Sequence, residues 1–150
     1  MAIYAGCDIP EELYYHPAHD LWVRLEGDDT ATLGMSDIAQ TAAGKLLYVR
    51  FKGVGKRVRP GQSAATIESA KWVGPFVVPF AAEILAVNTA YEQTITLANT
   101  DPYGAGWMVK VRLLDPPAAR AELITGAAAV AHFQQRIRDN QIRCYRCEDV

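Results

Sequence analysis

Several features that would assign the chain to a familiar class are missing. Its three cysteines are an odd number, which argues against a secreted disulfide framework and favours the reducing cytoplasm. No apolar run approaches the roughly 20 residues of a membrane-spanning helix, and the start, MAIYAGCDIPEELYYHP, has no basic segment followed by an apolar one. We therefore expect neither a membrane protein nor a signal peptide. No catalytic triad is recognisable, so acid–base catalysis by the chain itself is not expected.

Acidic residues are missing from one long stretch. The whole chain has Lys+Arg 15 and Asp+Glu 17, a balance that gives no reason to expect nucleic acid as a partner. Between Ile38 and Ile67, however, no aspartate or glutamate occurs. The stretch could be a solvated face balanced by acids elsewhere in the fold, or a docking surface. Its basic residues are Lys45, Arg50, Lys52, Lys56, Arg57 and Arg59.

What the sequence does contain is a series of short apolar segments separated by glycine and proline. We expect antiparallel sheets packed as a sandwich or flattened barrel, with a hairpin from 21–25 and 30–34 and further strands at 46–51, 63–68, 73–78, 84–87 and 107–113. A short helix should begin after Ser36 and end at Gly44. An apolar stripe predicts one helix or two over 118–142, with Gly126 as the candidate break.

One lysine interrupts a strand-like stretch, TIESAKWVGP, at residues 66–75. The polar Glu-Ser-Ala-Lys phrase predicts a reversal of the chain, with Lys71 exposed near its tip. An exposed, sterically free amine can attack an activated acyl group. Considered alone, however, this phrase fits an ordinary solvated lysine in a turn better than a modified one.

The ESAK phrase at 68–71, together with DPYGAGW at 101–107, resembles the H protein of the glycine cleavage system. Agreement extends to HDLWVR at 19–24 and GMSDIAQ at 34–40, and further to Gly44, Val58, Gly61, Glu83 and Asn88. The resemblance implies a mostly β fold, a lipoyl-type flattened sandwich with a short internal helix and a C-terminal helical extension. It divides the chain into an N-terminal extension at 1–18, a carrier domain at 19–114 and the helical extension with a CxxC tail at 115–150.

The same resemblance implies that Lys71 carries lipoic acid in amide linkage, and that the protein is a carrier and not an enzyme. Glu68 and Ser69 would belong to the surface that the lipoylating enzyme recognises. A separate hypothesis comes from the large indole of Trp72, which lies next to the modified lysine in sequence and is a candidate shield for the dithiolane. Biotin carriers present a lysine on a similar hairpin, but typically between methionines, whereas Ala70 and Trp72 flank Lys71 here. The implied partners are a lipoate–protein ligase or lipoyl transferase, dihydrolipoamide dehydrogenase and the enzymes of the pathway that uses the carrier.

Three features depart from the H-protein pattern: Ala82 replaces a glycine, the stretch from 38 to 67 is basic, and bulky Trp72 follows the lysine. With these departures the chain resembles the lipoate-binding proteins of sulfur-oxidising prokaryotes, which accompany a heterodisulfide-reductase-like complex. We therefore predict a carrier of sulfur intermediates. The alternative is an H protein that carries the aminomethyl group of glycine cleavage, and the second alternative is an unmodified H-protein-like interaction module.

The C-terminal Cys144 and Cys147 form a CxxC, which fits a redox pair, half of a zinc site, or terminal thiols without function. No second CxxC accompanies them, so a complete metal site within the chain is not expected. Cys7 is isolated in the sequence and receives no role.

Overall fold

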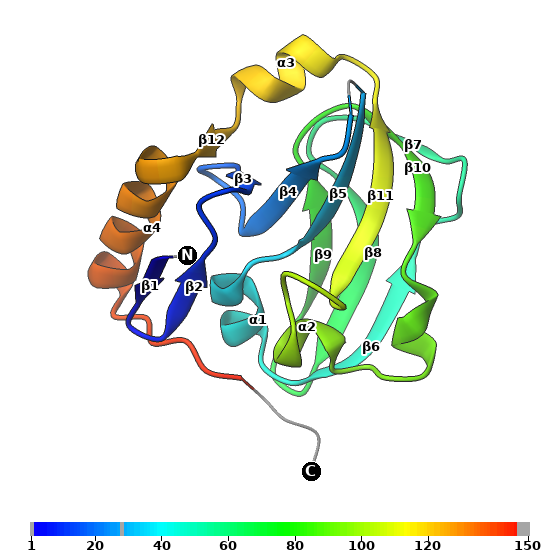
Figure 1. The fold of residues 1–150 in the computed structure, drawn as a ribbon. Coiled ribbons are helices and arrows are strands. Elements are labelled where there is room, and N and C mark those ends of the chain that lie inside the picture. Colours follow the sequence, from blue (N-terminus) through cyan, green and yellow to red (C-terminus); the bar gives the residue numbers. More distant parts are fainter. Residues whose placement is uncertain (1, 28, 147–150) are drawn as a thin grey trace.

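Two antiparallel β-sheets face each other across the larger of two apolar cores (Figure 1). The computed structural model describes residues 2–27 and 29–146. Within them no helix is both long and apolar enough to cross a bilayer. The mostly β sandwich with short internal helices and a helical C-terminal part confirms the fold expected from the sequence.

The larger sheet has seven strands in the order β12–β3–β4–β5–β11–β10–β7. Its strands are β3 (Tyr14–Tyr15), β4 (Leu21–Leu25), β5 (Thr30–Met35), β7 (Arg57–Val58), β10 (Ala82–Val87), β11 (Trp107–Leu113) and β12 (Ile124–Thr125). The smaller sheet, in the order β6–β8–β9, contains β6 (Leu46–Phe51), β8 (Gln62–Ser69) and β9 (Val73–Val78). A separate hairpin joins β1 (Ala2–Tyr4) to β2 (Cys7–Ile9).

The helices are short except for the last one. They are α1 (Asp37–Ala43), the 3-10 helix η1 (Thr89–Glu92), α2 (Leu97–Thr100), α3 (Pro116–Ala121) and α4 (Gly126–Asn140). As predicted, the Ser36 hydroxyl accepts the Ala39 amide at the start of α1, and Gly44, with φ +78°, ends it. Of the one or two helices predicted over 118–142 the structure has two, α3 and α4, and Gly126, with φ +60°, lies at the first position of the second one.

A second apolar core joins the two ends of the chain. It packs α4, through Phe133 and Ile137, against Trp22 of β4, Ile38 of α1 and the N-terminal segment. Strand β3 also pairs with both β4 and β12, so residues from both extensions complete the larger sheet. The boundaries of the carrier domain at 19 and 114 stay a prediction.

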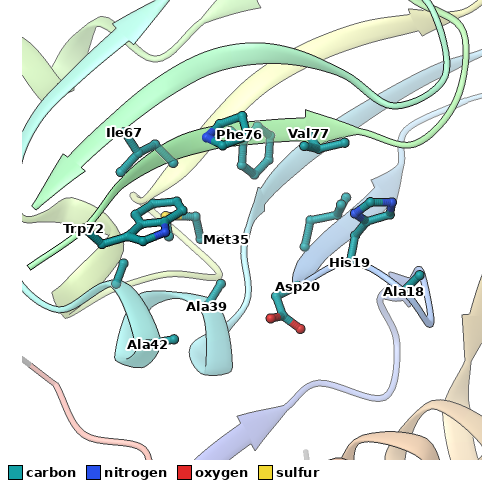
Figure 2. A pocket seen from close by; sticks show the side chains of 13 residues that line it. Ala18, His19, Asp20, Met35, Ala39, Ala42, Ile67, Trp72, Phe76 and Val77 are labelled. Atoms are coloured by element: carbon teal, nitrogen blue, oxygen red, sulfur yellow. The ribbon is translucent and has the colours of Figure 1, made fainter.

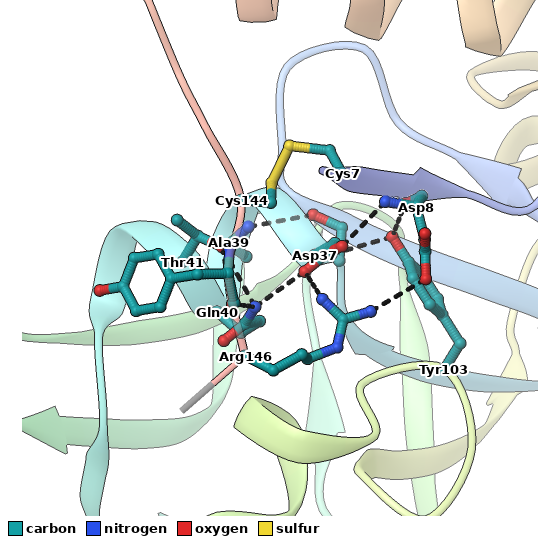
Figure 3. Close-up of a disulfide and its surroundings, with 11 residues drawn as sticks. Cys7, Asp8, Asp37, Ala39, Gln40, Thr41, Tyr103, Cys144 and Arg146 are labelled. Carbon is teal, nitrogen blue, oxygen red and sulfur yellow. Dashed lines mark hydrogen bonds and ion pairs between the residues drawn. A yellow bond between two sulfur atoms is a disulfide. The ribbon is translucent and has the colours of Figure 1, made fainter. Parts of the chain in front are cut away.

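A disulfide joins Cys7 of β2 to Cys144 across 137 residues of sequence (Figure 3). The chain places them together because the Cys144 amide donates to the carbonyl of Ala5, in the β1–β2 turn, over 3.0 Å. The assignment of no role to Cys7 was therefore wrong, and the odd cysteine count did not exclude a disulfide. Cys147 lies outside the described residues, and the sulfur of its predicted redox partner Cys144 is bonded to Cys7. The cytoplasmic location stays a prediction and loses the support of the cysteine count.

Residues beside the disulfide hold the C-terminal segment on α1 (Figure 3). The Arg146 guanidinium pairs with Asp37, which is fully buried, and lies 3.0 Å from Asp8 Oδ2. The Gln40 amide nitrogen of α1 donates to the Tyr145 carbonyl over 2.6 Å. Separating α1 from the C-terminal segment would leave the charge of Asp37 buried without a partner, which is costly. These contacts therefore hold α1 and the C-terminal segment together.

We predict that Cys7→Ser lowers the free energy of unfolding by about 3–5 kcal/mol, because the disulfide closes a loop of well over a hundred residues in the unfolded chain. Urea unfolding with and without a reductant measures the change. Reductant should lower the stability of the wild type by the same amount and leave Cys7→Ser unaffected. Cys147→Ser is the control and should behave as the wild type does. A loss of stability in that control would instead indicate a Cys144–Cys147 pair.

Candidate functional site

Lys71 lies in the turn between β8 and β9, and its side chain is exposed. Glu68 and Val73 form the last cross-strand pair, and beyond it the Ser69 amide donates to the Trp72 carbonyl over 2.8 Å. This bond closes a tight turn, and Lys71 is one of the two residues between its ends. Its amine makes no ion pair within the described residues.

Ser69 anchors this turn to the end of α1. The residue is buried, and its hydroxyl donates to the Ala43 carbonyl over 2.6 Å. Ser69 can therefore influence the lipoylating enzyme only through the shape of the turn. Glu68 is exposed beside it. The recognition of both residues by that enzyme stays a prediction.

Asn99 of α2 holds the same end of α1 from the other side. Its amide nitrogen donates to the Gly44 carbonyl over 2.8 Å, and its oxygen accepts the Leu46 amide over 2.9 Å. Asn99 is fully buried, so these bonds are protected from water. Sequence reasoning missed Asn99 and Ala43, and no local pattern marks either one.

Gly44 leaves room for the Lys71 side chain. A β-carbon at this glycine would lie 3.0 Å from Lys71 Cε, and the positive φ also disfavours any side chain here. The butyl chain of Lys71 therefore lies against the C-terminal end of α1, where backbone carbonyls favour a cation.

The indole of Trp72 forms one end of an apolar cavity of about 370 Å³ (Figure 2). The cavity lies between β9 and α1, and Ile67, Phe76 and Met35 contribute its apolar wall beside the indole. Gly74 fixes the place of this ring, because a β-carbon there would lie 2.6 Å from Trp72 Cε2. The cavity begins at the residue next to Lys71.

The opposite end of the cavity is polar. His19 and Asp20 line it (Figure 2). The Arg136 guanidinium of α4 donates a hydrogen bond from Nη2 to Asp20 Oδ2 over 2.7 Å. Outside the cavity, the ring of His16 lies 4.9 Å from that of His19. Burial and the nearby charge of His19 lower the pKa of His16. Within the described residues, no group of three or more potential ligands is arranged to hold a metal.

The DPYGAGW segment braces the beginning of α1. The Tyr103 hydroxyl accepts the Asp37 amide over 2.9 Å and donates to the Asp8 carbonyl over 2.6 Å. Burial raises the pKa of this hydroxyl, so it remains a donor. The Trp22 indole nitrogen donates to the Pro102 carbonyl over 2.8 Å and ties the segment to β4. The segment thus positions the helix on which the Lys71 turn rests.

The site fits an amide-linked lipoyl group. Lys71 offers an exposed amine that no described carboxylate neutralises, and an apolar cavity begins beside it. A β-scaffold that presents an exposed lysine at the tip of a hairpin fits one class, the carrier proteins that bear their cofactor covalently.

Comparison with known proteins gives the family. Residues 13–136 match the family "Glycine cleavage H-protein". The chain is 38% identical over 148 residues to "Probable glycine cleavage system H protein 2" of Saccharolobus solfataricus. The aligned region covers 97% of this chain and 99% of that protein. It is 40% identical over 147 residues to "Glycine cleavage system H protein 3" of Aquifex aeolicus, with 96% and 91% covered. The crystal structure of a glycine cleavage system H protein from Mycobacterium marinum superposes with a TM-score of 0.70 at 29% identity, over 89% of this chain and 100% of that one.

The chain therefore belongs to the glycine cleavage H-protein family. Members of this family carry lipoate covalently on a lysine and act as lipoyl carriers without catalytic activity of their own. The named relatives do not support the narrower resemblance to lipoate-binding proteins of sulfur oxidation, nor a heterodisulfide-reductase-like partner. They favour the alternative stated in the sequence analysis, an H protein of the glycine cleavage system.

We predict that Ser69→Ala lowers the free energy of unfolding by about 1–3 kcal/mol, because it removes the donor that satisfies the buried Ala43 carbonyl. Amide hydrogen exchange should also accelerate in the 69–72 turn. Thr66→Ala, on the exposed face of the same strand, is the control and should change stability by less than about 0.5 kcal/mol. Equal stability of the two variants would show that the anchor is not needed.

Proposed function

We propose that Lys71 is the lipoyl attachment site and that the protein carries the aminomethyl group of glycine cleavage. The observation that carries the proposal is the exposed Lys71 amine on a turn that Ser69 anchors to α1. The proposed partners are a lipoate–protein ligase or lipoyl transferase, the glycine cleavage enzymes and dihydrolipoamide dehydrogenase.

The chain's own residues hold and expose the attachment point. Ser69 and Asn99 fix the two segments that meet beneath the turn, so the position of Lys71 varies little between one encounter and the next. Holding a reactive group at one point of a rigid scaffold raises its effective concentration for each partner. Lipoate, once attached, supplies a disulfide that opens by attack at sulfur and re-forms by thiol–disulfide exchange.

Trp72 and the cavity wall give the same hairpin a sheltered side. The indole, Ile67 and Phe76 present apolar surface beside the attachment point, and His19 with Asp20 lines the far end. Apolar walls exclude water from a group that enters, and the polar end can accept a charged or hydrogen-bonding cargo.

A sulfur carrier remains a second candidate because of one observation, the sign of the charge beside the site. Strand β6 and its flanks carry exposed Lys45, Arg50 and Lys52, the basic stretch that departs from the H-protein pattern. Electrostatic complementarity selects partners, so a basic face fits a different set of enzymes.

We predict that the protein isolated from its own host carries the mass of a lipoyl group, and that Lys71→Arg lacks it, since arginine cannot form the amide. Intact-mass spectrometry measures both. Lys45→Arg changes another exposed lysine near the turn and should keep the modification. An unmodified wild type would instead support the interaction module, and a modified Lys71→Arg would move the site elsewhere.

We further predict that the host glycine decarboxylase transfers isotope label from the methylene carbon of glycine to the lipoylated wild type, as measured by intact mass. Lys71→Arg should remain unlabelled. If a persulfide donor adds sulfur to the wild type while glycine adds no label, the sulfur carrier is correct and the aminomethyl carrier is wrong.

Trp72→Ala should increase several-fold the rate at which a water-soluble phosphine reduces the attached disulfide, because it removes the indole that forms the apolar end of the cavity beside Lys71. The rate is followed by trapping the released thiols. Tyr48→Ala removes an exposed aromatic from β6, away from the cavity, and is the matched control. Unchanged reduction of Trp72→Ala would exclude a shielding role.

A further inference from the structure

Exposed apolar side chains gather around the Lys71 hairpin. The described part of the chain exposes eight large apolar side chains, and four of them belong to β6 or to the turn and start of β9: Leu47, Tyr48, Trp72 and Val73. Val73 is 65% exposed and Tyr48 is 51% exposed. A concentration of this kind beside a functional lysine indicates a contact surface and not scattered apolar residues.

The strand register places two of these residues, Tyr48 and Val73, on one face. One row runs Tyr48–Glu68–Val73 across β6, β8 and β9, and the next runs Arg50–Thr66–Pro75. All six side chains are exposed, and we call them the hairpin face. The second row lies only about 7 Å farther from the Lys71 turn than the first. A protein interface of about 800 Å² per partner that includes Lys71 would therefore cover both rows.

The charge around the hairpin face is mainly positive. Arg50 lies in its second row, Lys52 comes directly after the end of β6, and Lys45 follows Gly44, against which the Lys71 side chain lies. Within residues 2–27 and 29–146, these three cations make no ion pair. Arg57, from the same acid-free stretch, differs because it lies 3.6 Å from Glu83. Glu68 is the one acid of the hairpin face.

We infer that the hairpin face docks the lipoate–protein ligase, and that this ligase presents acidic side chains to Lys45, Arg50 and Lys52 around an apolar centre that covers Tyr48 and Val73. One hydrogen-bond donor of the ligase should meet Glu68. The inference rests on the proposed function, in which Lys71 is the attachment site.

The chemistry of attachment selects the ligase over the enzymes that act later. The deprotonated Lys71 amine forms an amide bond to the acyl carbon of lipoyl-adenylate, the bond from that carbon to the phosphate oxygen breaks, and AMP leaves. The proton of the amine passes to a base of the ligase or to water, and nothing is oxidised. The ligase must therefore take the ε-amine itself into its active site and contact the strands on both sides of the turn. Enzymes that act at the far end of a long attached group are not forced into this contact.

The experiment measures lipoylation of the full-length unmodified protein by the lipoate–protein ligase of the same host, with lipoate and ATP, at low and at high salt. Arg50→Glu should lower kcat/KM roughly five- to twentyfold, mainly through KM, and flatten the salt dependence, because it reverses a steering charge. Tyr48→Ala should lower kcat/KM several-fold and keep the salt dependence, since it removes only apolar contact.

Arg59→Glu is the matched control. Arg59 is an exposed cation of the same acid-free stretch, but it lies beyond the opposite end of β8, roughly 23 Å along the strand from the turn. It should be lipoylated within about twofold of the wild type. Circular dichroism and thermal unfolding establish that each variant is folded.

The outcomes separate this inference from the proposed function. If the wild type is lipoylated on Lys71 and both hairpin-face variants match it in rate and salt dependence, the docking inference is wrong and the attachment site stands. Normal lipoylation of both variants with impaired loading by glycine decarboxylase would assign the face to that enzyme, and would also overturn the inference. No lipoylation of the wild type would remove the proposed function and this inference together.

Discussion

The presentation of Lys71 depends on the hydrogen bond between the Ser69 hydroxyl and the last carbonyl of α1. A turn at the end of a hairpin makes few contacts with the rest of a protein, because the pairing of the two strands ends before it. Here the turn rests on a helix whose terminal carbonyl needs a donor. One hydrogen bond therefore both satisfies that carbonyl and fixes the position of the turn.

The helix under the turn is itself held at both ends. Tyr103 and the buried Asp37, which pairs with Arg146, hold its beginning, and Asn99 holds its end. These groups come from segments far apart in sequence, including the C-terminal segment that the disulfide attaches to β2. A seven-residue helix would be marginal in isolation, so its order must come from such tertiary contacts. The two extensions of the chain thereby contribute to the placement of Lys71.

Much of this arrangement could be predicted from local patterns. Ser36 and Gly44 marked the limits of α1, short apolar segments bounded by polar or glycine-containing turns marked β4, β5 and β11, and the polar ESAK phrase marked the turn. The Cys7–Cys144 disulfide could not be predicted, because the proximity of the two residues is produced by the β1–β2 hairpin and by the packing of α4. Asn99 was missed for a similar reason: an asparagine in a short helical turn carries no sign of the distant carbonyl that it will bind. The narrower assignment to sulfur chemistry rested on the sign of a surface charge, and the names of the relatives favour glycine cleavage.

The two unusual features of this hairpin lie on opposite sides of it, so each can change without the other. Trp72 turns toward the cavity, where it can do so only because Gly74 has no side chain, and it affects what the carrier encloses. Tyr48, Arg50 and Val73 lie on the outer face, where they affect which surfaces approach the lysine. In a β-strand neighbouring side chains point to opposite faces, so a substitution on one face need not disturb the other. The sheet of β6, β8 and β9 can therefore adapt separately to a cargo and to a partner enzyme while the anchored turn between β8 and β9 stays the same.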